Sequence, residues 1–437
     1  MNHQFWHSLF VAVILLGCLL VQTGRGQFLE SVIPVGDTPL DVIWNSTSNK
    51  VYVSNEQDGS VTVIDGATNQ IRATIAVADY PFDICHNSVL NKIYVASGEG
   101  SNRVNVIDGS GDTLIKKIVV SHNPIRMTFN GSLNKLYAYC NDDPYSRVAV
   151  IDGTTDEVVQ TISLRAANQL LWVPTTNRVL CYTDMDEDTV KAIDCVTDEV
   201  VARLPLPTGP DWLTAWCYCP FNDLVYLAAR REVYVLTPRG DSVVAVVPKV
   251  TEDFGEFGVM PNLRKLYVLD GGWLLAIDCV TNTVADSLRV GGGVLACDTM
   301  KMKAYTNAGG ACVVDARADT VIDSIPFGRT TNSMCFNYTN SRLYVSDYRD
   351  DCVWVVRDTT TGVCEPPNGI SPTERRVATV TRGALLVGDA GADLFGANGR
   401  RVAVLQAGMN DIGHLPPGAY LVRTSGRKEP GKVILTR

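Results

Sequence analysis

Histidine is scarce in this chain, and basic residues are outnumbered by acidic ones. Five histidines occur among 437 residues, and those after residue 26 are His86, His122 and His414. Such scattered imidazoles exclude a copper or zinc cluster built from histidine. Lys and Arg total 38 against 47 Asp and Glu, a net charge of −9. The chain therefore has no overall basic surface with which to bind nucleic acid.

Common catalytic motifs and disorder-promoting composition are also missing. The sequence contains no GxSxG, no P-loop and no HExxH, the motifs of serine hydrolases, phosphate-binding loops and zinc proteases. Charged residues make up only 19% of the chain and hydrophobic residues 46%. That balance excludes a mainly disordered protein, because there is ample apolar surface to bury.

One long apolar run is present, at the N-terminus. Leu9–Val21 carries no charge over 13 residues, which is too short for a membrane span of about 20 residues. It fits the apolar region of a secretory signal peptide over residues 1–26, with small residues near Gly26 for cleavage. Leu15–Cys18 loosely matches a lipobox, so lipidation of Cys18 is the alternative. No later run approaches 18 apolar residues, which predicts no transmembrane span in the mature chain.

A repeat of about 41 residues organises most of the sequence. Asn49–Val53 returns as Asn91–Val95 and as Asn134–Ala138, and weaker copies follow. Eight such anchors occur, at positions 52, 94, 137, 180, 226, 267, 305 and 344. A second anchor, Val63–Asp65 in the first copy, follows each of them. Repeats of this length that consist of short strands predict an eight-bladed β-propeller over residues 27–357.

Each unit is predicted to contain four strands. In the first unit these are Leu40–Asn45, Lys50–Ser54, Ser60–Ile64 and Gln70–Val77. The last unit lacks a fourth strand, and Phe28–Gly36 resembles Val321–Gly328; the N-terminal strand is therefore expected to complete that blade and remove an open sheet edge. The recurring Tyr is expected to pack between blades. The recurring Asp-Gly is expected to form a turn in which Gly supplies a positive φ.

The repeat, with its NKVYVSN and SVTVIDGATN segments, resembles the YVTN-type β-propeller repeat of bacterial and archaeal surface and secreted proteins. The resemblance covers nearly all of residues 28–357. It implies a propeller that is secreted or held at the bacterial cell surface, outside the cytoplasm. It implies no particular activity, since many such proteins are binding or structural modules.

The tail forms a separate module. Residues 358–375 are rich in turn-forming residues and are predicted to be a linker. Residues 376–437 are predicted to form a small β-sandwich-like domain with strands Arg376–Val380, Ala384–Val387, Arg401–Leu405, Ala419–Thr424 and Lys432–Leu435. Asp393–Val402 and Leu415–Arg423, with the basic C-terminus, resemble the C-terminal sorting domain of type IX secretion. The resemblance implies that secretion machinery is a partner; the alternative is a domain that only packs on the propeller.

Twelve cysteines remain after the predicted cleavage, all between residues 85 and 364. An even number in an exported protein suggests disulfides. Two pairs are candidates: Cys181 with Cys195, on adjacent strands, and Cys352 with Cys364. Other cysteines, including Cys217, are expected to be small buried thiols in innermost strands.

Acidic loops are expected to gather on one face of the ring. The loops between second and third strands lie on the same side as the connections between blades. We refer to their carboxylates as the acidic rim: Asp58, Asp142, Asp143, Asp184, Asp186, Asp188, Asp350 and Asp351. Several carboxylates together suit Ca²⁺ or a cationic partner, although solvated turns explain the same residues.

Two functions remain open from the sequence. The first is a monomeric, non-enzymatic binding module for a protein or glycan at the cell surface, with no catalytic residue and no cofactor beyond Ca²⁺ at the rim. The alternative is a propeller enzyme, a lyase or dehydrogenase, acting at the central channel. Charged side chains converging on that channel would favour the enzyme, and an apolar or plugged channel would favour the binding module.

Overall fold

The structure, a computed structural model, describes residues 26–359 except 78–79, 99, 143–145, 165–166, 184–188, 207–214, 230, 249–255, 308 and 329, and seven strands after residue 378. The chain divides into two compact units, residues 1–362 and 363–437. Residues 1–25 of the predicted signal peptide, including Cys18, and residues 360–375 of the predicted linker lie outside the described part.

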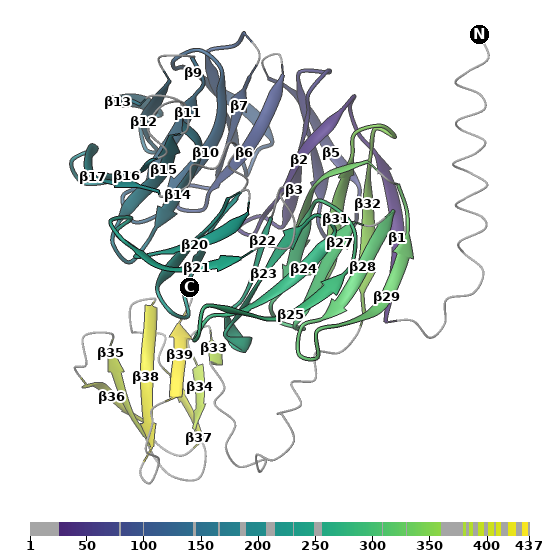
Figure 1. Cartoon of the computed structure of the whole chain (residues 1–437). Helices are drawn as coiled ribbons and strands as arrows, with labels where there is room; N and C mark the ends of the chain where they lie inside the picture. Colours follow the sequence, from purple (N-terminus) through teal and green to yellow (C-terminus); the bar gives the residue numbers. More distant parts are fainter. Residues whose placement is uncertain are drawn as a thin grey trace. The chain divides into compact units, whose positions relative to one another are not determined.

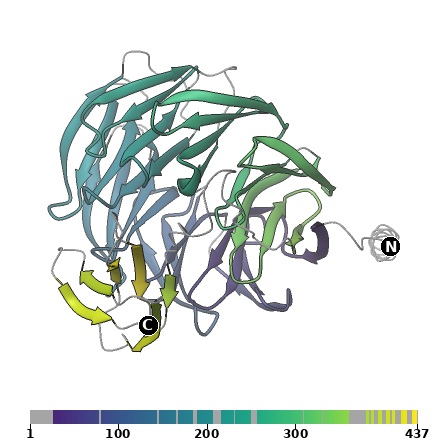
Figure 2. The same cartoon turned by 90° about the horizontal axis from the view of Figure 1, so that it is seen from below.

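The first unit is an eight-bladed β-propeller, as the repeat predicts (Figure 1). Every blade is a sheet of four antiparallel strands, ordered from the innermost to the outermost. Seen after a quarter turn, the blades follow one another around a ring (Figure 2). No helix long and apolar enough to span a membrane occurs among the described residues.

The first four blades have regular strands of six or seven residues. Blade 1 contains β2 (Pro39–Asn45), β3 (Lys50–Asn55), β4 (Ser60–Asp65) and β5 (Ile71–Ala76). Blade 2 contains β6 (Pro81–Asn87), β7 (Lys92–Ser97), β8 (Arg103–Asp108) and β9 (Thr113–Val119). Blade 3 contains β10 (Pro124–Asn130), β11 (Lys135–Cys140), β12 (Arg147–Asp152) and β13 (Glu157–Ser163). Blade 4 contains β14 (Ala167–Val173), β15 (Arg178–Thr183), β16 (Thr189–Asp194) and β17 (Glu199–Pro205).

The later blades are less regular. Blade 5 contains β18 (Ala215–Cys219), β19 (Leu224–Ala228), β20 (Glu232–Leu236) and β21 (Val243–Pro248). Blade 6 contains β22 (Phe257–Met260), the short 3-10 helix η1 (Pro261–Leu263), β23 (Lys265–Asp270), β24 (Trp273–Asp278) and β25 (Thr283–Arg289). Blade 7 contains β26 (Leu295–Asp298), β27 (Lys303–Asn307), β28 (Gly310–Asp315) and β29 (Thr320–Pro326). Blade 8 contains β30 (Thr331–Asn337), β31 (Arg342–Asp347), β32 (Cys352–Asp358) and β1 (Gln27–Pro34).

The N-terminal strand closes the ring, as predicted. β1 pairs antiparallel with β32 from Gln27 opposite Asp358 to Pro34 opposite Cys352. Figure 1 shows the purple β1 beside the light green β32, although more than 300 residues separate them in the chain. The first and last segments of the ring are therefore held in one sheet, and the edge of β32 is covered.

The hydrophobic core lies between neighbouring blades. Every residue of β3 is buried, whereas β5 is mostly exposed, so each blade becomes more polar toward its outer edge. In one cluster, Val233 and Val235 of blade 5 pack with Leu266, Val268 and Ile277 of blade 6. The blades are thus held together by faces of β-branched and aliphatic side chains.

A polar device repeats beside this core. Lys50 Nζ lies 2.6 Å from Asp112 Oδ1 in the next blade, and Tyr52 donates a 3.2 Å hydrogen bond to the same carboxylate. We call this the Lys–Asp–Tyr clamp. It recurs in the trios Lys92–Asp156–Tyr94, Lys135–Asp198–Tyr137, Lys265–Asp319–Tyr267 and Lys303–Asp358–Tyr305. The repeated Tyr therefore bonds to the neighbouring blade as well as packing against it.

The repeated Asp-Gly turn works differently from the expectation. Asp65 does accept hydrogen bonds from the N–H groups of Ala67 and Thr68. The positive φ, however, belongs to Asn69 (60°), four residues after Asp65, and not to Gly66. Gly66 is needed for close approach instead, since a Cβ there would lie 2.6 Å from the Asn49 carbonyl oxygen.

The second unit consists of strands only, among its described residues. A five-stranded sheet has the order β33-β39-β38-β35-β36, and β34 pairs with β37. The bounds are β33 (Thr379–Thr381), β34 (Ala384–Val387), β35 (Ala392–Gly396), β36 (Arg401–Leu405), β37 (Gly408–Asp411), β38 (Gly418–Thr424) and β39 (Gly431–Leu435). Four of the five predicted strands are present as β34, β36, β38 and β39; β33 shares only residues 379 and 380 with the fifth, predicted at Arg376–Val380, and β35 and β37 are additional.

Candidate functional site

In or just before the innermost strand of each blade lies one equivalent position, and in five of the eight blades its side chain lines one cavity. The position is four residues before the last residue of the strand, as Asp41 is before Asn45 in β2. The equivalent residues are found by counting back from the last residue of each innermost strand, which pairs with the first residue of the second strand in every blade. Around the ring they are Asp41, Asp83, Arg126, Gln169, Ala215, Glu256, Val294 and Ser333.

Four of these residues are charged, and they line one cavity. It has a volume of about 370 Å³. Its lining comes from blades 1, 2, 3, 6 and 8: Leu40, Asp41, Phe82, Asp83, Arg126, Glu256, Asn332 and Ser333. This is the size of a small-molecule site rather than of a protein-binding surface. The converging charges are the arrangement that the sequence analysis associates with the enzyme alternative.

Backbone groups of the next blade fix the three carboxylates. The Ile84 N–H donates to Asp41 Oδ2 (3.0 Å), and the Met127 N–H donates to Asp83 Oδ2 (2.8 Å). The Leu295 N–H donates in the same way to Glu256 Oε2. Each acid thus extends across a blade junction, and its orientation is set by the strand beside it.

Asp41 is the most fully bonded of the three acids. Its Oδ1 accepts hydrogen bonds from the Ser333 hydroxyl and from its neighbour Val42, both at 2.9 Å. By contrast, Asp83 Oδ1 and Glu256 Oε1 have no hydrogen-bond donor among the residues that the structure describes. Two carboxylate oxygens are therefore available to a molecule in the cavity.

The cavity makes these acids hard to ionise. Burial, and after it the nearby charge of Asp41, raise the pKa of Asp83 to about 7. Burial also raises the pKa of Glu256 to about 8, against the lowering effect of the Leu295 N–H. The pKa of Asp41 is raised for the same reason. Ionised carboxylates in such a site are stabilised by any cation that enters.

One cation belongs to the protein itself. The Arg126 guanidinium lies over the Phe82 ring, 5.0 Å from its centroid, and donates a 3.1 Å hydrogen bond to the Ile125 carbonyl. Its charge lowers the pKa of both Asp41 and Asp83, but less than burial raises each. Three carboxylates with one guanidinium give the ionised cavity a net charge of −2.

Two residues of the acidic rim, Asp58 and Asp351, are on the same face as this cavity. Pro39, at the start of β2, pairs with Asn55 at the end of β3, and the loop after Asn55 carries Asp58. Asp58 and Asp351 accept hydrogen bonds from the N–H groups of Asp37 and Thr38, at 2.8 and 3.0 Å. These two rim residues therefore hold the connection between β1 and β2.

The other predicted rim residues are less defined. Asp142 lies 3.4 Å from Arg147, an exposed ion pair. The Asp350 N–H contacts Asp347 Oδ1 in the turn after β31. Asp143, Asp184, Asp186 and Asp188 lie outside the described residues. Among the described residues no three acids, cysteines or histidines are grouped as metal ligands.

Of the two predicted disulfides, the structure describes both cysteines of one only. Cys181 and Cys195 are buried free thiols. The register explains the correction, since Cys181 pairs with Lys191, four residues before Cys195. Cys352 is likewise a free thiol, and Cys364 lies outside the described residues. Cys195 instead occupies the position that Gly66 has in blade 1.

The channel residues were missed from the sequence. No recognised motif contains the charged channel residues Asp41, Asp83, Arg126 and Glu256. The repeat is recognised by residues that recur from unit to unit, whereas the channel position varies. A signal was nevertheless present: when the units are aligned on the last residue of the innermost strand, this position carries a charged residue in four of the eight units.

Comparison with known proteins identifies the fold but no family. No family model matches the chain, and no curated protein matches it. Two solved structures are similar: the hydrazine synthase of Kuenenia stuttgartiensis (17% identity, TM-score 0.52) and the computationally designed Ika8 protein (14% identity, TM-score 0.61). They cover 77% and 75% of this chain, and 99% of each is covered in turn. At this identity the likeness establishes the β-propeller fold alone.

Proposed function

We propose that the protein is an exported binding propeller that holds a small cationic molecule in its central cavity. The observation that carries this proposal is the presence of Asp83 Oδ1 and Glu256 Oε1, both without a donor among the described residues, in one cavity of about 370 Å³. An ammonium group supplies the hydrogen bonds and the positive charge that these oxygens lack.

The surroundings of the cavity support the same ligand class. Acidic loops on the same face produce a negative potential that attracts cations toward the channel. Phe82 offers an aromatic face, and Arg126 is placed to bind an acidic group of the same ligand. The ligand class that best fits is therefore a small amine, with or without a carboxylate, presented as a free molecule or at the end of a surface polymer.

Export and surface delivery complete the proposal. They rest on the Leu9–Val21 segment, on the YVTN-like repeat and on the likeness of the tail to a type IX sorting domain. Fractionation of cells that express the chain truncated after Gly369 tests the delivery step. We expect the truncated protein to be retained inside the cell; surface display in normal amounts would leave the tail without a sorting role.

Thermal-shift and calorimetric titration test the ligand class. The probes are a diamine, a quaternary amine, a free amino acid and a neutral disaccharide. We expect the amines to stabilise the wild type and to have no effect on the D83N/E256Q double variant. D58N/D350N is the matched control, because it removes two carboxylates from the rim and leaves the cavity intact. Binding of the neutral disaccharide alone would refute the proposal.

A second function is favoured by the pKa values of the cavity acids. Asp83 and Glu256 come from blades 2 and 6, on opposite sides of the ring, and their pKa values are raised to about 7 and 8. Carboxyls that titrate near neutral pH suit general acid–base catalysis, as in a lyase. Turnover of a glycan panel that is lost in both D83N and E256Q would support this function over simple binding.

A further inference from the structure

One contact repeats at the junctions between blades. The last residue of the innermost strand in one blade faces the residue that follows the third strand in the next blade. Thus a Cβ on Gly109 would lie 2.9 Å from Asn45 Nδ2, and one on Gly66 would lie 2.6 Å from Asn337 Nδ2. Between blades 5 and 6 the two equivalent residues are Cys219 and Cys279. Both members of the Asn–Gly pair are replaced by cysteine at this one junction.

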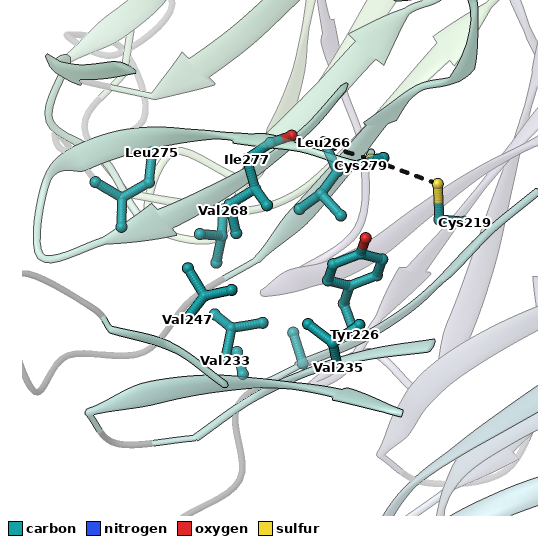
Figure 3. Close-up of a cluster of buried hydrophobic side chains, with 12 residues drawn as sticks. Cys219, Tyr226, Val233, Val235, Val247, Leu266, Val268, Leu275, Ile277 and Cys279 are labelled. Carbon is teal, nitrogen blue, oxygen red and sulfur yellow. Dashed lines mark hydrogen bonds between the residues drawn. The ribbon is translucent and has the colours of Figure 1, made fainter. Parts of the chain in front are cut away.

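The two cysteines touch. Their Sγ atoms are 3.6 Å apart, and each residue is only 1% exposed. Figure 3 shows them facing each other across the junction, beside Tyr226 and the apolar cluster of blades 5 and 6. Among the described cysteines no other two sulfurs lie within hydrogen-bond distance of each other.

The same junction lacks the usual ionic link. The residue that opens the second strand is Lys or Arg in seven blades, but it is Leu224 in blade 5. The acid of the clamp is also replaced, by Asn282, which accepts a 2.6 Å hydrogen bond from Tyr226. A neutral hydrogen bond contributes less than a buried, charge-assisted one, so this junction gains more from a covalent link than a junction with a complete clamp does.

We propose that Cys219 and Cys279 form a disulfide that fastens blade 5 to blade 6. A disulfide bond is about 2.05 Å long, so the sulfurs must approach by roughly 1.5 Å, a movement within the range of side-chain torsions. The backbones need little displacement, because the packed blades already hold the two sulfurs face to face. The bond closes a loop that spans 60 residues and links two sheets across a junction that lacks the Lys–Asp ion pair of the clamp.

The chemistry is thiol–disulfide exchange with a disulfide donor. The sulfur–sulfur contact lowers the pKa of Cys219 to about 6 and raises that of Cys279, which makes Cys219 the attacking thiolate. Cys219 attacks the donor and forms a mixed disulfide, and one donor thiol leaves. Cys279 then attacks the Cys219 sulfur and releases the second donor thiol. The donor is reduced to two thiols, which take up the protons, while the two cysteines are oxidised.

Peptide mapping of the full chain tests the proposal. The protein is refolded with a mixture of oxidised and reduced glutathione, and its free thiols are alkylated in denaturant before digestion. We expect one cross-linked peptide pair, containing Cys219 and Cys279 and lighter by about 2 Da than the two free peptides. Cys217, two residues away on the same strand, should be recovered alkylated. Recovery of Cys219 and Cys279 as alkylated thiols from folded protein would overturn the proposal.

A variant that restores the repeat serves as the second measurement. Cys219→Asn with Cys279→Gly recreates the pair seen at Asn45 and Gly109 and is expected to fold. Reduction should lower the Tm of the wild type by about 5 °C and leave the Tm of this double variant unchanged. Cys217→Ser is the matched control and should keep the full response to reductant. An equal response in the double variant and the wild type would refute the link.

Discussion

The two ends of the innermost strands differ in how strictly the sequence repeats there. At one end the second strand begins with Lys or Arg in seven of the eight blades, and in five of them this residue is the lysine of a Lys–Asp–Tyr clamp. Toward the other end lies the channel position, where Asp occurs twice and Arg, Gln, Ala, Glu, Val and Ser occur once each. The five clamps are alike because each joins two neighbouring blades at the same place in the repeat. The channel residues differ in type, and those of blades 1, 2, 3, 6 and 8 line one cavity.

Removal of the closing strand β1 is expected to have the largest effect on stability. Deletion of residues 28–36 exposes the whole edge of β32 and removes the Arg342–Glu30 ion pair. We expect a loss of about 5 kcal/mol or more, or no cooperative folding at all. Chemical denaturation followed by circular dichroism measures it. Glu30→Gln, which keeps the strand, is the control, and unchanged melting of the deletion would contradict ring closure.

Breaking a single clamp is expected to have the next largest effect on stability. Asp156→Ala leaves the Lys92 ammonium and the Tyr94 hydroxyl without their partner in a largely buried site. The expected cost is about 3 to 5 kcal/mol in the free energy of unfolding. Glu157→Ala is the neighbouring control, since its 3.9 Å contact with Lys116 is exposed and should be worth less than about 0.5 kcal/mol. Equal losses of stability in the two variants would refute the stabilising role of the clamp.

The channel acids predict a distinct pH dependence. The folded-state pKa of Glu256, about 8, lies above its ordinary value of 4.5, and that of Asp83, about 7, lies above 3.8. The folded protein therefore binds more protons than the unfolded chain between these values, so its stability falls as the pH rises from about 4 to 8. Over that range the free energy of unfolding of D83N/E256Q should fall by about 1 to 2 kcal/mol less than that of the wild type. This figure allows for screening by water in the cavity.

Urea denaturation at pH 5 and pH 8 measures this difference. The D58N/D350N rim variant should behave like the wild type, because it leaves both channel acids in place. A wild type and a D83N/E256Q variant with the same pH profile would show that the acids titrate normally, and the proposed role of the cavity would then lose its electrostatic basis.

The rim should give the smallest effects on stability. Neutralising Asp184, Asp186 and Asp188 together is expected to change the free energy of unfolding by no more than about 0.5 kcal/mol, as exposed loop charges usually do. The same variant should bind Ca²⁺ or a basic partner more weakly, particularly at low salt, where screening is least. Calorimetric titration with Ca²⁺ decides this; an identical response in both proteins would leave the rim as a solvated edge.

Local pattern was sufficient to predict the blades. The recurrence of Tyr52 and its equivalents, with alternating strands between turns, predicts the number of blades and the place of β1. The Asp-Gly turn was only half understood from sequence, because the positive φ is at Asn69, whereas Gly66 is required by its close approach to Asn337 of blade 8. Such a contact depends on the neighbouring repeat, which local propensity does not include.

The sequence by itself determined the architecture, because hydrophobic periodicity and repeat length can be recognised within each unit of about 41 residues. What only the tertiary structure decided is which side chains meet. Asp83 and Glu256 are separated by more than 170 residues in the chain, yet ring closure brings them to one cavity. Cys219 finds Cys279 rather than its strand neighbour Cys217, because contact across a blade junction follows from the packing of two sheets and not from spacing along one strand.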